Sequence, residues 1–366
     1  MARSKVQTLS KQDLYDILNG ACILGCGGGG PLTLGNQLLR EVVRKGKVTI
    51  IDPASADDNE LMAIAAGVGS PLAAAQGFPF DAANIAFQEL NKIQSKASGK
   101  SFSYVLPGEV GAGNSVIPMT VAVLAKVPII DGDGARRAIP GLDMVTYASH
   151  KVPISPVVLA NQDETISFNA ADAKIAGVTT DGIISGGAFK EDAGLALWSM
   201  NGATMKKVVI RNTMSYARDL GAALRKAIKA KKDPVVAVRR YIKGKLLFVG
   251  KISSVQQRTK EGFDFGTITL QNKNATFTIY NQNENLIAWS DKSTQPLVMA
   301  PDLICYLTAD GQPFSNADLE LVKNKEVAII AAPCAKQMQT ASIVAAFQAS
   351  LKKMGYAGRH AWLAEL

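Results

Sequence analysis

The sequence predicts an α/β protein: a layered domain with a mostly parallel sheet, plus a second domain built as a β-rich barrel or sandwich. Three observations predict this class. Apolar runs of strand and helix character alternate up to about residue 230, and short β-branched or aromatic runs replace them between 245 and 333. The chain also has 366 residues, which is too long for one typical hydrophobic core.

The first predicted helix begins after Ser10. This serine stands at the N-cap, Asp13 occupies the matching capping-box position, and apolar residues recur at helical spacing as far as Leu24. The run "GCGGGG", Gly25–Gly30, follows this helix directly. A second helix, "LTLGNQLLREVVRKG", is then predicted to end at Gly46, because glycine suits a helix C-terminus.

The remaining elements follow in order along the chain. Periodicity predicts strands at 47–52, 61–69, 101–108 and 127–134, and helices at 80–96 and 114–126. After Lys231, seven short runs separated by Asn, Gly, Asp and Pro predict the barrel or sandwich, with no helix longer than about three turns in it. The domains are therefore predicted at 1–234 and 235–335, with a helical 336–366 segment packing back on the first.

Composition and charge exclude several classes of protein. With 47% hydrophobic and 19% charged residues, the chain has the composition of a soluble globular protein. The net charge of +9 is concentrated between Arg225 and Lys245, at helical spacing and without interleaved aromatic residues, which argues against nucleic-acid binding. No apolar run approaches a membrane span, the start lacks a secretory signal, and the four cysteines lack framework spacing. We therefore expect a cytoplasmic protein.

The glycine run admits three interpretations. Residues 25–30 satisfy the G-x-G-x-x-G spacing of a dinucleotide turn, and Asp52 ends the next strand, but a helix precedes the run and Pro31 follows it. A flexible helix C-cap and turn is the second interpretation. The third is a loop whose N–H groups converge on a ligand. Since a C-cap needs only one glycine, we favour the ligand-facing loop and expect it to line one cleft with Glu109 and Asp131.

The richest chemistry lies in residues 107–144. Glu109 follows a predicted strand and opens a second glycine-rich turn before Asn114, and Asp131 ends the next strand. Because ligands bind outside the carboxyl ends of strands in α/β sheets, both acids are candidates for a site. The arginines that follow can hold a substrate carboxylate or enolate, although the same residues also suit a structural ion-pair network. The full set is Glu109, Gly111, Gly113, Asn114, Asp131, Asp133, Arg136 and Arg137.

These motifs resemble the S-methyl-thiohydantoin desulfurase family. The resemblance rests on "GGGGPLTLG", on "PGEVGAGNSVIPMTVA…VPIIDGDGARRAIPGLDM", on "VGSP" at 68–71 and on "APDLICYLTADGQP", and it spans roughly 10–335. It implies an α/β domain with a β-rich second domain, and hydrolysis of an S-methyl-thiohydantoin to a hydantoin and methanethiol. Genes of this family commonly accompany hydantoinase or oxoprolinase-like enzymes.

Matching the family motif places its recurrent positions on Glu109, Gly111, Gly113, Asn114, Asp131, Asp133, Arg136 and Pro140. Three departures fall within the motifs. Pro31 stands where the family usually has an aspartate, Arg136-Arg137 replaces Gly-Arg, and 140–142 reads Pro-Gly-Leu where an acidic "PEL" segment is usual. Either arginine therefore matches the family arginine.

The resulting functional hypothesis is a hydrolase that cleaves a C–S bond in a thiohydantoin-like ring. Its predicted catalytic residues are Glu109, Asp131, Asp133 and Arg136, with Glu109 or Asp131 as the base and an arginine as the electrostatic clamp. Its predicted substrate-binding residues are Gly28, Gly29, Gly30, Gly111, Gly113, Asn114 and Arg137. No cofactor is predicted, and a metal site and the roles of Cys26 and His150 stay open.

Two other functions remain as alternatives. One is a non-catalytic ligand-binding or regulatory subunit of a hydantoinase-type system, and the other is a dinucleotide-dependent oxidoreductase. The predicted partners are a small-molecule substrate and either further copies of this chain or hydantoinase-like subunits. Neither nucleic acid nor a membrane is a predicted partner.

Overall fold

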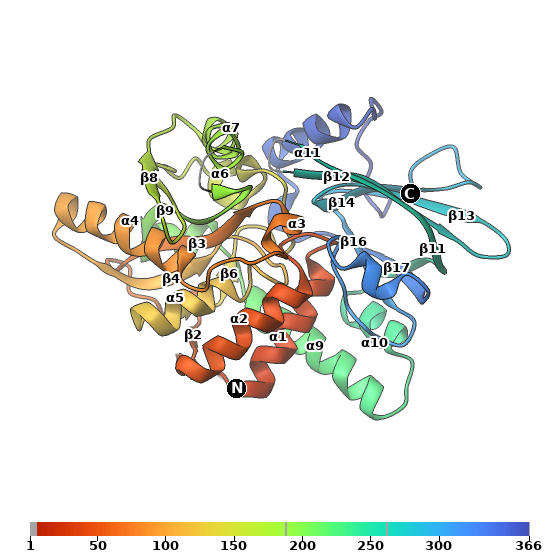
Figure 1. The fold of residues 1–366 in the computed structure, drawn as a ribbon, viewed down its shortest axis with the longest axis horizontal. Helices are drawn as coiled ribbons and strands as arrows, with labels where there is room; N and C mark the ends of the chain where they lie inside the picture. Colours follow the sequence, from red (N-terminus) through yellow and green to blue (C-terminus); the bar gives the residue numbers. More distant parts are fainter. Residues whose placement is uncertain (1–5, 187–188, 261–262, 366) are drawn as a thin grey trace.

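The structure, a computed structural model, describes residues 6–186, 189–260 and 263–365, and its ribbon is drawn in Figure 1. An α/β part and a curved sheet of long strands lie side by side in this view. The α/β part is built on one mixed sheet of eight strands, in the order β1-β2-β5-β4-β3-β9-β7-β8. The strands are β1 (Val6–Thr8), β2 (Thr49–Ile51), β5 (Ile129–Ile130), β4 (Phe102–Pro107), β3 (Leu61–Gly69), β9 (Asp192–Asn201), β7 (Val157–Ala160) and β8 (Thr165–Phe168).

The predicted α/β class is confirmed, and the parallel part of the sheet is its centre. Strands β2, β5, β4 and β3 pair in parallel. Antiparallel strands extend this centre on both sides, with β1 next to β2 and with β9, β7 and β8 beyond β3. The strand predicted at 61–69 is β3, with the same bounds.

Helices cover both faces of this sheet, so its central strands are buried on both sides. In β3, Ala63 and Ala65 belong to one apolar cluster, whereas Met62 and Ile64 belong to another on the opposite face. A strand buried on both faces needs apolar residues at successive positions, which explains the continuous run "LMAIAAGVG".

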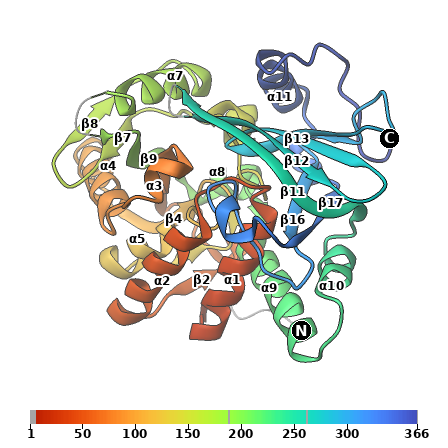
Figure 2. The same cartoon turned by 45° about the vertical axis from the view of Figure 1, so that its right-hand side comes forward.

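The first cluster packs the sheet against α1 (Lys11–Leu24), α2 (Leu32–Lys45), α4 (Ala82–Ser98), α5 (Ile117–Ala125) and α9 (Thr213–Lys229). Figure 2 shows α1, α2 and α9 on the same side of the molecule. The predicted capping box of α1 is present, because the Ser10 side chain accepts from the Asp13 N–H and the Asp13 carboxylate accepts from the Ser10 N–H. The basic residues Lys226 and Lys229 lie in the last turn of α9, where their positive charges interact favourably with the negative end of the helix dipole.

The second cluster contains residues of α6 (Thr146–Ser149), α7 (Ala173–Ile184), α8 (Gly202–Val208) and α11 (Ala341–Lys353). Side chains of α11, including Phe347, pack in it with Met144 and Tyr147 of the α/β part and with Leu286 of the second sheet. The C-terminal helix thus contacts both parts of the molecule. Short helices α3 (Pro71–Ala74) and α10 (Pro234–Tyr241) complete the named helices.

The second sheet is antiparallel and forms a nearly closed barrel, in the order β15-β14-β13-β12-β11-β17-β16. Its strands are β11 (Lys245–Lys260), β12 (Phe263–Gln271), β13 (Thr276–Gln282), β14 (Glu284–Ser290), β15 (Val298–Met299), β16 (Leu303–Thr308) and β17 (Glu326–Ala332). Each of the seven predicted runs is one of these strands. In the described part of 235–335, helical structure is limited to α10 and a short turn at Leu319–Val322, as predicted. The domain boundary at 234/235 stays a prediction.

A two-stranded sheet of β6 (Gly132–Asp133) and β10 (Ile210–Arg211) joins the end of β5 to the start of α9. No helix in the described ranges combines the length and apolar character needed to cross a membrane.

Candidate functional site

A cavity of about 290 Å³ lies between the α/β part and the barrel. Its wall on the α/β side comes from the glycine run, the ends of β3 and β9, the turn after β4, the loop at 139–145 and one face of α7. The turn between β13 and β14 closes it from the barrel side, and α11 supplies a further wall. The site is therefore assembled from segments that are far apart in the sequence.

Glu109 lines this cavity and is 7% exposed. One carboxylate oxygen, Oε1, accepts from Asn114 Nδ2 at 2.6 Å, and Oε2 accepts from the Ile139 N–H at 2.7 Å. Asn114 is itself held, because its Oδ1 accepts from the Gly67 N–H at 2.7 Å. The Glu109 carboxyl is thus fixed in one orientation beside the cavity.

Burial dominates the ionisation of Glu109. It raises the pKa of this carboxyl to about 7, although the hydrogen bonds from Asn114 and Ile139 favour the charged form. Nearby Asp133 raises the pKa further, while Arg137 lowers it. A carboxyl with a pKa near 7 can exchange a proton with a substrate at neutral pH.

The glycine run follows helix α1 and packs on the second glycine-rich turn. Gly25 is the C-cap of α1, and the Gly29 carbonyl accepts from the N–H groups of Gly113 (2.8 Å) and Asn114 (3.0 Å). A Cβ on Gly29 would lie 2.6 Å from the Gly111 Cα, so only glycine permits this approach. Because a helix rather than a strand precedes the run, it is not the strand–turn–helix arrangement of a dinucleotide site.

Of the predicted substrate-binding residues, Gly29, Gly30, Gly113 and Asn114 line the cavity. Gly111 packs closely on the Gly29 backbone instead, and Gly28 lies against the side chain of Glu284. The expected common cleft of the glycine run and Glu109 is therefore present. Asp131 is not among the residues that line it.

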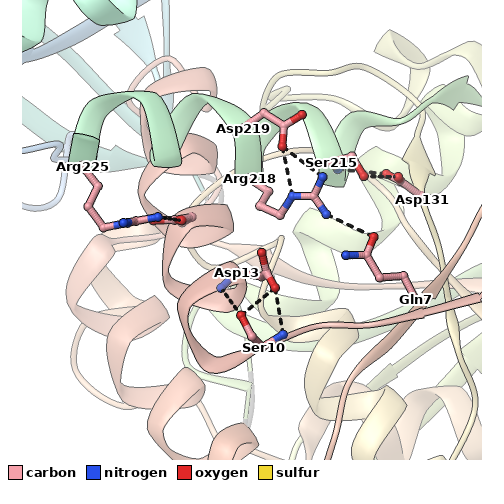
Figure 3. Close-up of polar contacts among 9 residues, drawn as sticks. Gln7, Ser10, Asp13, Asp131, Ser215, Arg218, Asp219 and Arg225 are labelled. Atoms are coloured by element: carbon pink, nitrogen blue, oxygen red, sulfur yellow. Dashed lines mark hydrogen bonds and ion pairs between the residues drawn. The ribbon is translucent and has the colours of Figure 1, made fainter. Parts of the chain in front are cut away.

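Asp131 and Asp133 support the fold around α9. Asp131 accepts from the N–H and the hydroxyl of Ser215, in the first turn of that helix (Figure 3). The helix N-cap, Asn212, makes no side-chain capping bond, so Asp131 supplies that acceptor from a distant segment. Asp133 is fully buried and accepts from the N–H groups of Ala135 and Arg136, and burial raises the pKa of its carboxyl to about 7.

Neither predicted arginine lines the cavity. Arg137 is 0% exposed, and its guanidinium donates to four backbone carbonyls, those of Ala138, Asn285, Pro301 and Asp302. It thereby ties the α/β part to the barrel. The Arg136 guanidinium lies 5.0 Å from the centre of the Tyr216 ring, a cation–π contact. The expected clamp on a substrate is thus not in position, because Arg137 is engaged by backbone oxygens.

Cys26 and His150 also lie away from the cavity lining. Cys26 is buried; burial raises the pKa of its thiol, but Cys305 and Arg137 lower it, and the net pKa is about 7. His150 Nδ1 lies 2.9 Å from the Thr146 carbonyl oxygen, one turn earlier. The described residues contain no group of three or more His, Cys, Asp or Glu side chains placed to hold a metal ion.

Sequence reasoning missed Glu284, which enters the cavity from the barrel. It is 2% exposed, and its Oε2 has no hydrogen-bond partner. Burial, and then the neighbouring Glu109, raise the pKa of Glu284 well above its usual range, while Arg137 lowers it. The signal available in the sequence was the polar run "NQNEN" at 281–285 between two apolar runs. In the structure all five of its residues are buried.

Models of two protein domains match nearly the whole chain. The S-Me-THD-like, N-terminal domain matches residues 12–169, and the S-Me-THD-like, C-terminal domain matches residues 185–356. The chain belongs to the S-Me-THD-like family. Glu109 falls in the N-terminal domain of this family and Glu284 in its C-terminal domain. The two carboxyl groups therefore come from the two family domains and meet at one cavity.

A crystal structure of a protein from Chromobacterium violaceum has the same fold. It is 29% identical to this chain with a TM-score of 0.86, and the match covers 98% of this chain and 100% of that one. No curated protein matches this chain significantly.

Proposed function

We propose that this protein is a hydrolase of an S-methyl-thiohydantoin or a related five-membered cyclic amide, which adds water to the ring and releases methanethiol. Two observations support the proposal: membership of the S-Me-THD-like family, and a cavity lined by a buried carboxyl with a pKa of about 7. The carboxyl of Glu109 is the observation that carries it, because water attack on a ring carbon needs a base poised near neutral pH.

The lining of the cavity suits a small, partly apolar heterocycle. Side chains such as Ile64, Phe78 and Ile117 provide apolar surface for a methylthio group. Four lining residues also carry a buried polar atom without a hydrogen-bond partner: Thr180 Oγ1, Trp198 Nε1, Gln282 Oε1 and Glu284 Oε2. Because unpaired buried polar atoms cost free energy, a ring with amide N–H and C=O groups gains affinity by pairing with them.

In this proposal Glu109 is the general base. Its carboxylate takes a proton from water as the water oxygen bonds to the ring carbon that carries the sulfur, and the C–S bond then breaks. Asn114 and the Ile139 N–H hold the carboxylate in position for this step. Such positioned proton transfer contributes roughly 10²–10⁴-fold to a rate.

The experiment that tests this function is a turnover assay on the purified protein. An S-methyl-thiohydantoin is the substrate, released methanethiol is measured with a thiol reagent, and the hydantoin is measured by chromatography. We expect the two products in equal amounts. Saturable binding of the substrate without release of methanethiol would instead identify a non-catalytic ligand-binding subunit, and nucleotide absorbance in the purified protein would revive the oxidoreductase alternative.

A further inference from the structure

Glu284 occupies a position that the surrounding structure fixes from several sides. The next residue along, Asn285, donates its backbone N–H to the Cys26 carbonyl at 2.7 Å and its side-chain amide to the Ile304 carbonyl at 3.1 Å. On the other side, the Asn283 N–H donates to the Asp264 carbonyl at 2.8 Å, and its side-chain oxygen accepts from the Asp264 N–H at 2.8 Å. The turn is therefore held on both flanks of Glu284.

The glycine run makes room for this carboxyl. A Cβ on Gly28 would lie 1.8 Å from Glu284 Oε1, so any other residue at this position would displace the carboxyl group. The Glu284 carboxyl thus lies against the glycine loop on one side and the cavity on the other, and its Oε2 lacks a partner. Buried polar atoms in native proteins are normally paired, so an unpaired one at a cavity marks a place for a ligand.

Burial and the neighbouring charges together raise the pKa of Glu284. Glu109 lines the same cavity, and the charge of the buried Arg137 lowers the pKa of both carboxyl groups. Burial is the largest influence on the pKa of Glu284, and the neighbouring carboxylate raises that pKa further. Because the pKa of Glu284 is raised the more strongly, Glu109 ionises first, and Glu284 keeps its proton after Glu109 has lost its own.

We propose that Glu284 is a catalytic acid that acts together with Glu109 and protonates the leaving sulfur. This inference rests on the proposed function. The Glu109 carboxylate first takes a proton from water while the C–O bond forms and negative charge passes to the ring nitrogen. That charge then re-forms the C=N bond, the C–S bond breaks, and the sulfur takes the Glu284 proton and leaves as methanethiol. Finally, Glu109 gives its proton to the ring nitrogen and Glu284 takes the hydroxyl proton, so the amide forms and both carboxyl groups return to their starting states.

The test compares two substrates that differ only in the acidity of the departing thiol. S-methyl-thiohydantoin needs a proton on its sulfur, whereas the S-trifluoroethyl analogue releases a much more acidic thiol that departs without one. We expect Glu284→Gln to lower kcat on the S-methyl substrate by roughly 10²–10³-fold, and on the S-trifluoroethyl substrate by less than about tenfold. Glu109→Gln, in contrast, is expected to lower kcat on both substrates to a similar extent.

A control variant and a second measurement separate the possible outcomes. Glu326→Gln, an exposed position on β17 of the same barrel, should behave as the unchanged protein on both substrates. In the unchanged protein, activity on the S-methyl substrate should also fall as the pH rises past the raised pKa of Glu284, and this fall should be absent with the S-trifluoroethyl substrate. That comparison needs no variant, so it decides the matter even where Glu284→Gln fails to fold.

The results that overturn the inference differ from those that overturn the function. If the unchanged protein turns over neither substrate, the proposed function fails. If it turns over both, but Glu284→Gln is equally active on the S-methyl substrate or equally impaired on the two, Glu284 is not the acid for sulfur and the proposed function stands. An alkaline fall that is the same for both substrates also contradicts the inference.

Discussion

Two buried groups of charged side chains lie close together in this molecule and differ in how they are partnered. In the 131–137 loop, Asp131, Asp133 and Arg137 are each held by two or more hydrogen bonds, mostly to backbone groups. At the cavity, Glu109 borders open space and Glu284 keeps an oxygen without a partner. Residue type and strand-end position are similar in the two groups, so neither distinguishes support of the fold from chemistry.

The difference teaches that hydrogen-bond satisfaction and access decide what a buried charge can do. Where each polar atom already has a partner, replacing the side chain exposes unpaired groups and costs stability. A buried carboxyl with a raised pKa at a cavity instead destabilises the folded protein, and it can exchange a proton with a ligand. Access to the cavity is what sets Glu109 apart, since both of its oxygens accept hydrogen bonds, whereas Glu284 also keeps an unpaired oxygen. The following predictions test this distinction.

The largest effect is expected for Glu109→Gln. The amide keeps the shape of the side chain but cannot accept a proton, so kcat for the S-methyl-thiohydantoin should fall by roughly 10²–10⁴-fold. The melting temperature of the same preparation should fall by only a few degrees, since no buried charge is left unpaired and the glutamine amide loses just one of the two hydrogen bonds that Glu109 accepts from Asn114 and Ile139. Full activity, or a protein that no longer folds, would place Glu109 with the structural group.

Arg137→Met should chiefly affect stability. It removes a fully buried guanidinium and leaves four backbone carbonyls without their donor, which is expected to lower the free energy of unfolding by about 3–5 kcal/mol. Urea denaturation measures this. The matched control is Arg136→Met, which removes the cation–π contact with Tyr216 and should cost about 1 kcal/mol. Equal losses for the two arginines would contradict the distinction.

The pH dependence of stability should separate Glu109→Gln from the unchanged protein. The pKa of Glu109 is about 7 in the folded protein, above its usual value of 4.5, so the folded state binds the proton more tightly than the unfolded state. This group therefore makes stability fall as pH rises from about 5 to 7, by up to about 1.4 kcal/mol per pH unit. The variant lacks this contribution, and its stability relative to the unchanged protein should increase over that range in urea titrations. A constant difference would show that the pKa of Glu109 is not raised.

Asp131→Asn is expected to have a small effect on both stability and activity. Asparagine keeps an acceptor for the Ser215 N–H but loses the negative charge at the start of α9, which should cost about 1–2 kcal/mol in the free energy of unfolding. Its kcat should stay within about threefold of the unchanged protein, because the carboxyl does not line the cavity. A large loss of kcat with unaltered unfolding would return Asp131 to the catalytic group.

Much of the fold was predictable from local patterns. The capping box at Ser10, the continuous apolar run of β3 and the seven barrel strands all leave a signal within a few neighbouring residues. The antiparallel strands β7, β8 and β9 beside β3 were not predicted, because strand order depends on pairings between segments far apart in the chain. The capping of α2 shows the same limit: Pro31 makes no side-chain capping bond, and the barrel residue Asp318 accepts from the Leu32 N–H instead.

The sequence by itself determined the fold class, the family resemblance, and Glu109 and Asn114 as candidates for the site, because each is encoded in periodicity or in a contiguous motif. Only the tertiary structure decided that Asp131 and Arg137 are engaged away from the cavity and that Glu284 completes it. The physical reason is that burial, hydrogen-bond partners and a neighbouring carboxyl are contributed by segments far away in the chain. Those surroundings set the pKa of a side chain and its access to the cavity, whereas the sequence shows only which residue type stands at each position.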